Sequence, residues 1–204
     1  MDIILASGSP RRKELLTQIG IKDYRVVTSD VDENVDRDMP PDQIVEMLSR
    51  RKAEAVREQV GEDALIIAAD TVVALEGEVL GKPLDESDAF RMLSALSGNR
   101  HQVYTGFTVL CGGESVTGHE KTDVTFRELE AQEIEDYIAT EEPMDKAGAY
   151  GIQGIGAVLI SGIEGDYFNV MGLPVYRLSR VLGEFGVDTL ALAAGRRTEK
   201  DNGR

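Results

Sequence analysis

Apolar residues recur along the chain with two spacings, and their order predicts strands and helices in alternation. Residues 3–6 form a short apolar run, and a Gly/Ser turn leads from this run into a segment whose leucines and isoleucine recur at helical spacing. The beginning of the chain is therefore predicted to form a strand, a turn and a helix. Ser9 is placed to cap this helix, Pro10 suits its first position, and Gly20 suits its end.

The same alternation continues over longer segments. A helix is expected over residues 43–59, and a buried strand over residues 65–75 turns back at Glu76-Gly77 onto a short return strand. Beyond these, the pattern predicts a helix from Asp85 to Leu96, β-segments over 101–110 and 115–129, a helix over 130–139, a strand ending at Ile160 and a final helix over 174–185. Such interleaving is typical of the α/β class with a mixed sheet.

Length and charge narrow the picture. One domain is expected over residues 1–194, followed by a polar, disordered tail over residues 195–204. Acidic residues outnumber basic ones by 37 to 22, and the formal net charge of −15 argues against nucleic acid or an anionic membrane as a partner. Any anion must therefore be bound by a local cluster of basic groups.

Two further features bear on compartment and assembly. The single Cys111 excludes an internal disulfide and a multi-cysteine metal site. The chain shows neither a basic leader with a long apolar run nor a later run of membrane-spanning length, so a cytoplasmic protein is expected. A homodimer is the common default for such a protein.

The first turn combines features of an anion site. Ser7, Gly8 and Ser9 are small enough to let backbone amides approach a ligand, at the point where the following helix presents its positive end. Arg11 and Arg12 lie in that first helical turn, where cations oppose the helix dipole unless an anion compensates them. The alternative is that both guanidinium groups extend into water.

Asp70 interrupts an apolar run over residues 65–73. A carboxylate inside a sheet costs several kcal/mol unless it is paired or metal-bound, about the cost of any buried unpaired ion. We therefore interpret Asp70 as a metal ligand or general base at the end of a strand, where ligands gather in α/β sheets. The alternative is an aspartate that caps a turn.

Other charged residues are candidates only in combination. Glu33 could supply an oxygen ligand to a hard divalent cation, although acidic loops are common in so acidic a chain. Lys52 and Lys82 are individually typical of solvated lysines, yet with Arg12 they could surround a polyphosphate. Neither common nucleotide-binding glycine motif occurs. We interpret both histidines, His101 and His119, as structural.

Four segments in order resemble the Maf family of nucleotide pyrophosphatases. They are LASGSPRR at residues 5–12, AADTV at 68–72, GKP at 81–83 and DKAGAYGIQG at 145–154, and GLP at 172–174 also fits. The resemblance implies an elongated α/β domain with a central mixed sheet and a substrate cleft, similar to inosine triphosphate pyrophosphatases. It also implies hydrolysis of a nucleoside triphosphate to the monophosphate and pyrophosphate, with Mg²⁺ or Mn²⁺ as cofactor, in sanitation of the nucleotide pool.

The resemblance assigns roles to matching positions. Asp70 matches the proton acceptor, and Glu33 matches a functional acidic position that, with Asp70, is a candidate metal ligand. Whether Asp70 serves as both base and ligand stays open. The substrate or phosphate contacts implied at the remaining positions are Ser7, Ser9, Arg12, Lys52 and Lys82.

The resemblance also indicates which nucleobase the substrate carries. Members that act on dTTP and UTP carry an Arg after the motif proline, a Thr after the catalytic Asp and a Gln in the glycine-rich loop; here these are Arg11, Thr71 and Gln153. Members that act on 7-methyl-GTP differ at these places. Uracil and thymine present two carbonyl acceptors flanking one N–H, which Arg11 and the Gln153 amide can match. A dTTP/UTP enzyme is therefore expected, with Arg12 on phosphate and Arg11 on the base.

Two rival functions stay open at this point. One is a non-catalytic nucleotide-binding regulator of septum formation, which would bind nucleotides tightly without turnover. The other is a pyrophosphatase for noncanonical purine nucleotides, which would prefer inosine or xanthosine triphosphate.

Overall fold

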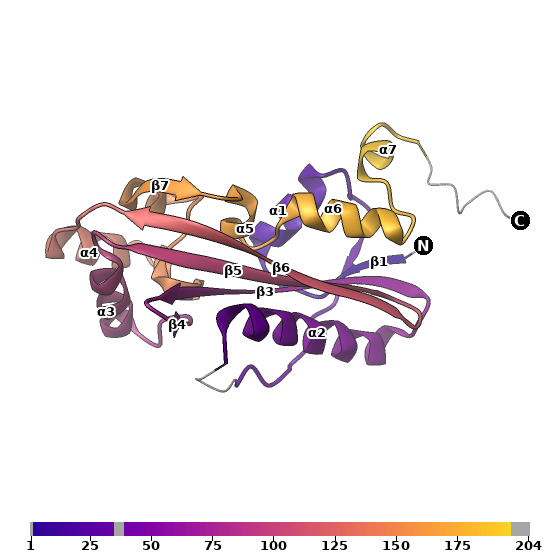
Figure 1. Ribbon diagram of the computed structural model, residues 1–204, viewed down its shortest axis with the longest axis horizontal. Helices are drawn as coiled ribbons and strands as arrows, with labels where there is room; N and C mark the ends of the chain where they lie inside the picture. The colour runs from indigo at the N-terminus through magenta and orange to yellow at the C-terminus, as the bar shows by residue number, and fades with distance from the viewer. Residues whose placement is uncertain (1, 35–38, 197–204) are drawn as a thin grey trace, which may run out of the picture.

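A long, twisted mixed sheet runs along the molecule and forms its frame (Figure 1). The computed structural model describes residues 2–34 and 39–196. The strands are β1 (Asp2–Leu5), β2 (Arg25–Val26), β3 (Ala64–Leu75), β4 (Glu78–Leu80), β5 (Arg100–Cys111), β6 (Glu114–Phe126) and β7 (Ile160–Glu164). Their order is β2-β1-β3-β5-β6-β7, and β4 also pairs with β3. β1 runs parallel to β2 and β3, whereas the other pairs are antiparallel, so the predicted mixed sheet is confirmed.

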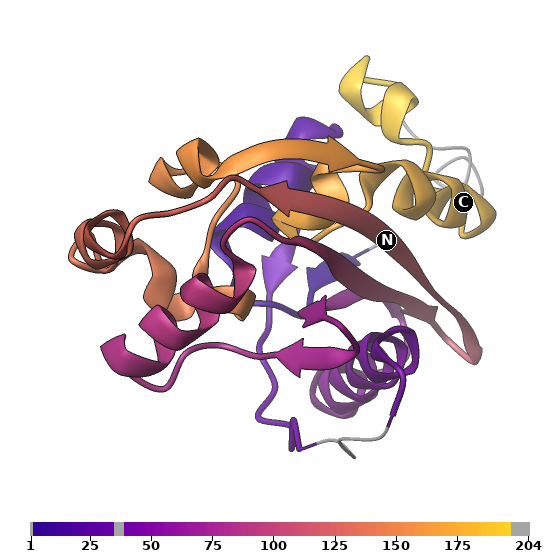
Figure 2. The same ribbon diagram turned by 60° about the vertical axis from the view of Figure 1, so that its left-hand side comes forward.

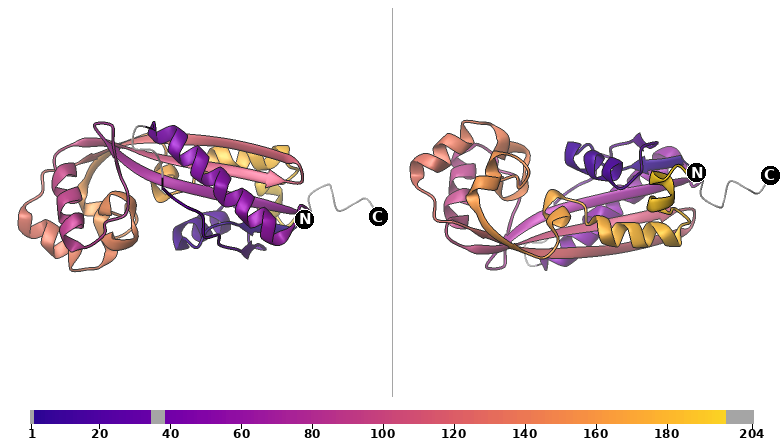
Figure 3. Two further views of the ribbon diagram at one scale, coloured as in Figure 1. Left: turned by 90° about the horizontal axis from the view of Figure 1, so that it is seen from below. Right: turned by 90° about the horizontal axis from the view of Figure 1, so that it is seen from above.

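Helices cover both faces of this sheet (Figures 1 and 3). The α-helices are α1 (Pro10–Gln18), α2 (Pro41–Val60), α3 (Glu86–Leu96), α4 (Ala131–Ile138), α5 (Tyr167–Met171), α6 (Val175–Glu184) and α7 (Thr189–Ala193), and the 3₁₀ helices are η1 (Glu142–Asp145), η2 (Ala147–Ala149) and η3 (Ile155–Leu159). α2 lies alone along one face, α1 and α6 lie on the other, and α3 and α4 form a separate group at the far end. Among the described residues, no helix is both long and apolar enough to cross a membrane.

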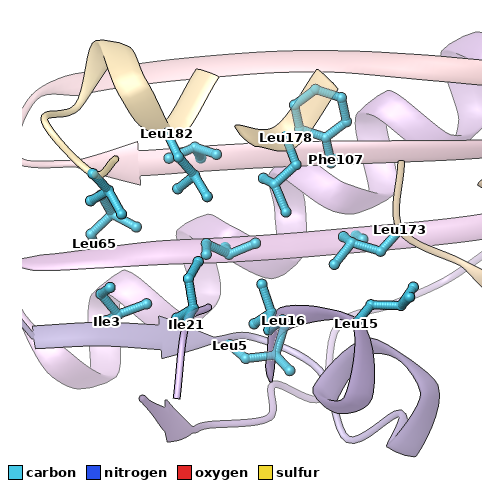
Figure 4. Close-up of a cluster of buried hydrophobic side chains, with 14 of the residues drawn as sticks. Ile3, Leu5, Leu15, Leu16, Ile21, Leu65, Phe107, Leu173, Leu178 and Leu182 are labelled. Carbon is cyan, nitrogen blue, oxygen red and sulfur yellow. The ribbon is translucent and has the colours of Figure 1, made fainter. Parts of the chain in front are cut away.

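β3 is buried on both faces, which explains its continuous apolar run. Successive side chains of a strand point to opposite faces. Leu65 and Ile67 therefore pack in a cluster with residues of α1 and α6 (Figure 4), whereas Ile66 and Ala68 pack against Ala53 of α2. The same alternation sends the side chains of β3 at positions 70 and 71 to opposite faces of the sheet.

A second hydrophobic cluster holds the far end of the molecule, where α3 and α4 pack on the sheet (Figure 2). Its centre is an aromatic group in which His101, Phe126 and Tyr150 meet edge to face, with ring centroids 4.8 to 5.4 Å apart. His101 Nε2 and the Tyr150 hydroxyl are 2.8 Å apart. His101 is completely buried, which agrees with the structural role expected for it.

Most predicted elements are present, and several local expectations are wrong. Ser9 occupies the N-cap position of α1, but its side chain makes no capping hydrogen bond. The strand expected to end at Ile160 instead begins there, because the residues before it form the 3₁₀ helix η3. By contrast, Asp85 caps α3 as predicted, accepting a hydrogen bond from the Asp88 N–H.

Short elements account for the other differences. β2 and α5 lie in segments for which no element is predicted, and α7 follows α6, so the helix expected to be final is not. β6 ends at Phe126, three residues before the predicted limit of residue 129. The predicted tail over residues 195–204 lies mostly outside the described residues.

The buried His101 predicts a specific pH dependence of stability. Burial lowers the pKa of His101 from 6.5 to about 4. Between pH 6.5 and about pH 4, His101 is protonated in the unfolded chain but stays neutral in the folded chain. The free energy of unfolding therefore falls over this window, by at most about 3 kcal/mol from this residue.

Urea denaturation of the wild type and His101→Gln at several pH values isolates this contribution. The wild type should be more stable at neutral pH, and its advantage should shrink by about 3 kcal/mol toward pH 4. A difference that stays constant with pH would show that His101 does not remain neutral in the fold.

Candidate functional site

The site lies where the edge of β3 is uncovered. β5 pairs with β3 from residue 66 to residue 74 on one edge. On the opposite edge, β1 pairs only with residues 64–67 and β4 only with residues 73–75. The segment over residues 68–72 therefore lies in a gap between two partner strands, and it contains Asp70 and Thr71.

This arrangement corrects one prediction about Asp70. The residue lies in the middle of β3, paired with Gly106 of β5, and not at the end of its own strand. The neighbouring strand β1 ends instead, since its last paired residue, Leu5, lies opposite Ile67. Asp70 is 9% exposed and is reached through the gap that β1 leaves.

A cleft of about 630 Å³ opens at this gap. The predicted residues that line it are Ser7, Ser9, Arg11, Arg12, Glu33, Lys52, Asp70, Thr71 and Lys82. Asp145 and Lys146 also line it, so five basic and three acidic side chains among the described residues line the cleft. A chain with net charge −15 thus concentrates positive charge at one place, which confirms the expected local basic cluster.

Lys52 joins two carboxylates inside the cleft. Its Nζ donates to Asp70 Oδ1 at 2.5 Å and lies 2.6 Å from Glu33 Oε1. The hydrogen bond from Lys52 lowers the pKa of Glu33 below its usual value, although partial burial opposes this. Both acids that the sequence singles out therefore meet at a single ammonium group.

A glycine on the neighbouring strand allows α2 to lie close to the sheet. Gly106 pairs with Asp70, and a Cβ at Gly106 would come within 2.3 Å of the Val45 backbone. α2 therefore touches β5 backbone to backbone beside Asp70. This close approach brings Lys52, two turns further along the helix, to the face of β3 on which Asp70 lies.

Arg12 ties together the other face of the gap. Its Nε donates to the Gly172 carbonyl at 2.8 Å, NH1 donates to Ser7 Oγ at 3.1 Å, and NH2 donates to Thr71 Oγ1 at 3.0 Å. Burial lowers the pKa of Arg12, although the charge of Asp70 opposes the shift. Arg12 thus positions the first turn, β3 and the α5–α6 connection relative to one another.

Two contacts join α1 to the segment over residues 145–154. Arg11 NH1 lies 3.7 Å from Asp145 Oδ2, and Gln153 Nε2 donates weakly to Glu14 Oε2 at 3.4 Å. Gln153 is exposed and, unlike the other predicted site residues, is not among those that line the cleft. The structure thus brings Arg11 to the cleft and places Gln153 beside it.

Glu142 fixes the glycine-rich loop that carries Gln153. Its carboxylate accepts hydrogen bonds from the Ile155 and Gly156 amides at 2.8 and 3.0 Å and from the Tyr137 hydroxyl at 2.9 Å. No role was predicted for this residue. Its only signal in the sequence is its place shortly before the motif at residues 145–154.

Asp145 and Lys146 are further cleft residues to which no role was predicted. Lys146 Nζ donates to Asp145 Oδ1 at 2.6 Å and to the Glu142 carbonyl at 2.5 Å. Burial opposes ionisation of Asp145, but Lys146 and Arg11 together lower its pKa. The motif at residues 145–154 contains both residues, so the signal was present.

The acidic residues suit a metal that arrives with a phosphate ligand. Among the described residues, no cluster of three or more His, Cys, Asp or Glu side chains could hold a metal alone. Asp70 and Glu33 nevertheless converge on Lys52 Nζ and offer two carboxylate groups. Mg²⁺ is commonly held by one or two carboxylates, with phosphate oxygens and water completing its shell.

Comparison with solved structures defines the class of fold. A HAM1 protein from Coxiella burnetii superposes with a TM-score of 0.54 over 90% of this chain and 99% of its own, at 14% sequence identity. Because the identity is so low, this likeness concerns the fold alone. The expected α/β fold with a central mixed sheet is thereby confirmed.

Sequence comparison then gives the family. The model for Maf-like proteins matches residues 2–185, and the chain belongs to the Maf family. A relative from Moorella thermoacetica is 53% identical over 189 residues, covering 91% of this chain and 96% of the relative. A relative from Bacillus cereus (strain ZK / E33L) is 48% identical over 186 residues, with the same coverage. Both relatives are named dTTP/UTP pyrophosphatase.

Substitution of the two adjacent arginines should lower stability to different extents. Arg12→Lys replaces a fork that serves three acceptors by one ammonium, and should lower the free energy of unfolding by about 1–3 kcal/mol. Arg11→Lys, the matched control, alters one exposed ion pair and should cost less than about 1 kcal/mol. Urea denaturation of both variants checks this, and equal losses would contradict the positioning role of Arg12.

Proposed function

We propose that this protein hydrolyses nucleoside triphosphates, preferably dTTP and UTP, to the monophosphate and pyrophosphate with a divalent metal. The observation that carries the proposal is a nearly buried Asp70 in the gap of β3, within a cleft that five basic side chains of the described residues line. The names of the relatives at 48% and 53% identity support it. The proposal includes a cytoplasmic location and a role in sanitation of the nucleotide pool.

Asp70 acts as the base in this proposal. Its carboxylate orients a water molecule toward the α-phosphorus and accepts the proton as the new P–O bond forms and the bond to pyrophosphate breaks. Lys52, which donates a hydrogen bond to Asp70, can turn toward a phosphate oxygen once the nucleotide brings its own charge. Arg12 and Lys82 line the same cleft and add positive charge for the leaving group.

Asp70 and Glu33 would hold Mg²⁺ or Mn²⁺ together with phosphate oxygens. The metal would supply Lewis-acid polarisation of the phosphate when bound. Lys52 contacts both carboxylates. Lys52 must therefore release one or both carboxylates when the cation binds, and its ammonium group then becomes available to the substrate.

Selection of the base is assigned to Arg11, Thr71 and Gln153. Arg11 and Gln153 both rest on acidic side chains in this structure, Asp145 and Glu14 respectively, through long and exposed contacts. Such contacts contribute little, so the carbonyl groups of uracil or thymine can replace them at low cost. Ser7 and Ser9 are left to contact the phosphates at the first turn.

Asp70→Asn tests the catalytic role. Pyrophosphate release from UTP with Mg²⁺ should fall by about 100-fold or more, since the amide cannot accept the proton. Asp123→Asn, on β6 and outside the cleft lining, is the matched control and should retain activity.

Near-normal turnover by Asp70→Asn would sink the proposed mechanism. If the wild type binds UTP but releases no pyrophosphate, the result would favour a non-catalytic nucleotide-binding regulator of septum formation. Preference for inosine or xanthosine triphosphate in the same assay would favour the purine enzyme, and chelation of the metal tests its requirement.

Arg11→Tyr tests the division of labour between the two arginines. The value of kcat/KM for UTP should fall by about tenfold or more, since a carbonyl of the base loses its partner. Inhibition by inorganic tripolyphosphate, which has no base, should change by less than about twofold because Arg12 is intact. Equal losses in the two measurements would refute the assignment of Arg11 to the base.

A further inference from the structure

A chain of hydrogen bonds leads from the cleft into the sheet behind Thr71. Arg12 NH2 donates to Thr71 Oγ1 at 3.0 Å, and Thr71 Oγ1 lies 2.9 Å from Thr105 Oγ1. Thr105 Oγ1 in turn donates to the backbone carbonyl of Asn169 at 2.8 Å. Thr105 is completely buried on β5, so this chain is closed to water behind Thr71.

The last partner in the chain fixes the direction of every hydrogen bond before it. A carbonyl can only accept, so the single hydroxyl hydrogen of Thr105 points at Asn169. Thr105 must then accept in its contact with Thr71, and the single hydrogen of Thr71 points away from the cleft. Because Arg12 can only donate, it also leaves Thr71 as an acceptor. Thr71 therefore has a lone pair, and no hydrogen, to offer a ligand.

The residue that carries this carbonyl is anchored by its side chain. The Asn169 side-chain amide donates to the Val103 carbonyl and to Thr122 Oγ1, each at 3.0 Å. Thr122 spends its own hydrogen on the Asp166 carbonyl at 2.9 Å, so it too can only accept from Asn169. Asn169 is completely buried, and these bonds join α5 to the two long strands.

We propose that Thr105 is a positioning residue that makes Thr71 an obligatory hydrogen-bond acceptor and thereby favours uracil and thymine over cytosine. The inference rests on the proposed function, in which Thr71 contacts the base. Uracil and thymine have one donor on their pairing edge, N3–H, which a lone pair of Thr71 can accept. Cytosine has an unprotonated N3, which would face that lone pair without a hydrogen between them.

The surroundings of Thr71 agree with a contact to the base. Thr71 lies on the face of β3 opposite Asp70 and Lys52, beside the cleft-lining residues Val73 and Gly172. The hydroxyl of Thr71 is thus separated by the thickness of the sheet from the Asp70–Lys52 pair, and its direct charged neighbour is Arg12.

Thr105→Val tests the inference, because valine keeps the shape and removes the hydroxyl. The hydrogen of Thr71 is then free to turn into the cleft and donate to cytosine N3. The ratio of kcat/KM for UTP to that for CTP should fall by about tenfold, and Thr105→Ser should restore it to within about twofold of the wild type. If Thr105 had only a structural role, the substitution would lower kcat/KM for both substrates equally and leave their ratio unchanged.

Thr108→Val is the matched control on the same strand. Thr108 is equally buried, but its hydroxyl contacts Ser49 and Thr117 on the α2 face, so its loss should leave the ratio unchanged. If Thr105→Val does not fold, Thr71→Val removes the acceptor itself and should lower the ratio similarly.

An unchanged ratio in either Thr105→Val or Thr71→Val, or an equal shift in Thr108→Val, overturns the inference while UTP turnover by the wild type leaves the proposed function standing. A wild type that releases no pyrophosphate from UTP overturns both.

Discussion

The uneven pairing of β3 is the constraint on which the rest of the structure depends. One edge of this strand is bonded to β5 almost throughout, whereas the other is covered only at its two ends, by β1 and β4. The strand therefore stays buried while five of its residues remain open at one edge. Because successive side chains alternate, the open segment presents Asp70 to one face and Thr71 to the other. A single gap in pairing thus creates a two-sided site.

Two cations of the cleft are held by protein groups, Lys52 by carboxylates and Arg12 by neutral acceptors. Lys52 contacts both Asp70 and Glu33, and Arg12 spends a hydrogen bond from each of its three nitrogens on the protein. Burying such groups unpaired would cost several kcal/mol each, an order of magnitude set by desolvation of ions. A nucleotide that brings phosphate and a cation would exchange these partners for its own. The acidic surface elsewhere makes this basic cleft the favoured place for a polyanion.

Local patterns in the sequence predicted most of the frame, because helical and strand periodicities depend on neighbouring residues. The placement of Asp70 failed for the opposite reason: whether a carboxylate lies at a strand end or beside a gap depends on where β1 stops, and β1 lies sixty residues earlier in the chain. Eight further site residues were predicted to lie together and do so, while Gln153 lies outside the cleft lining and contacts Glu14. The chain of hydrogen bonds through Thr105 could not be predicted, since it joins three segments that lie far apart in the sequence.

The most direct test of the central claim is the position of attack on the nucleotide. UTP is hydrolysed in water labelled with heavy oxygen, and the two products are separated and analysed by mass spectrometry. If Asp70 directs water at the α-phosphorus within the gap of β3, the label must appear in UMP and be absent from pyrophosphate. Label in pyrophosphate, or release of labelled orthophosphate in its place, would contradict the account.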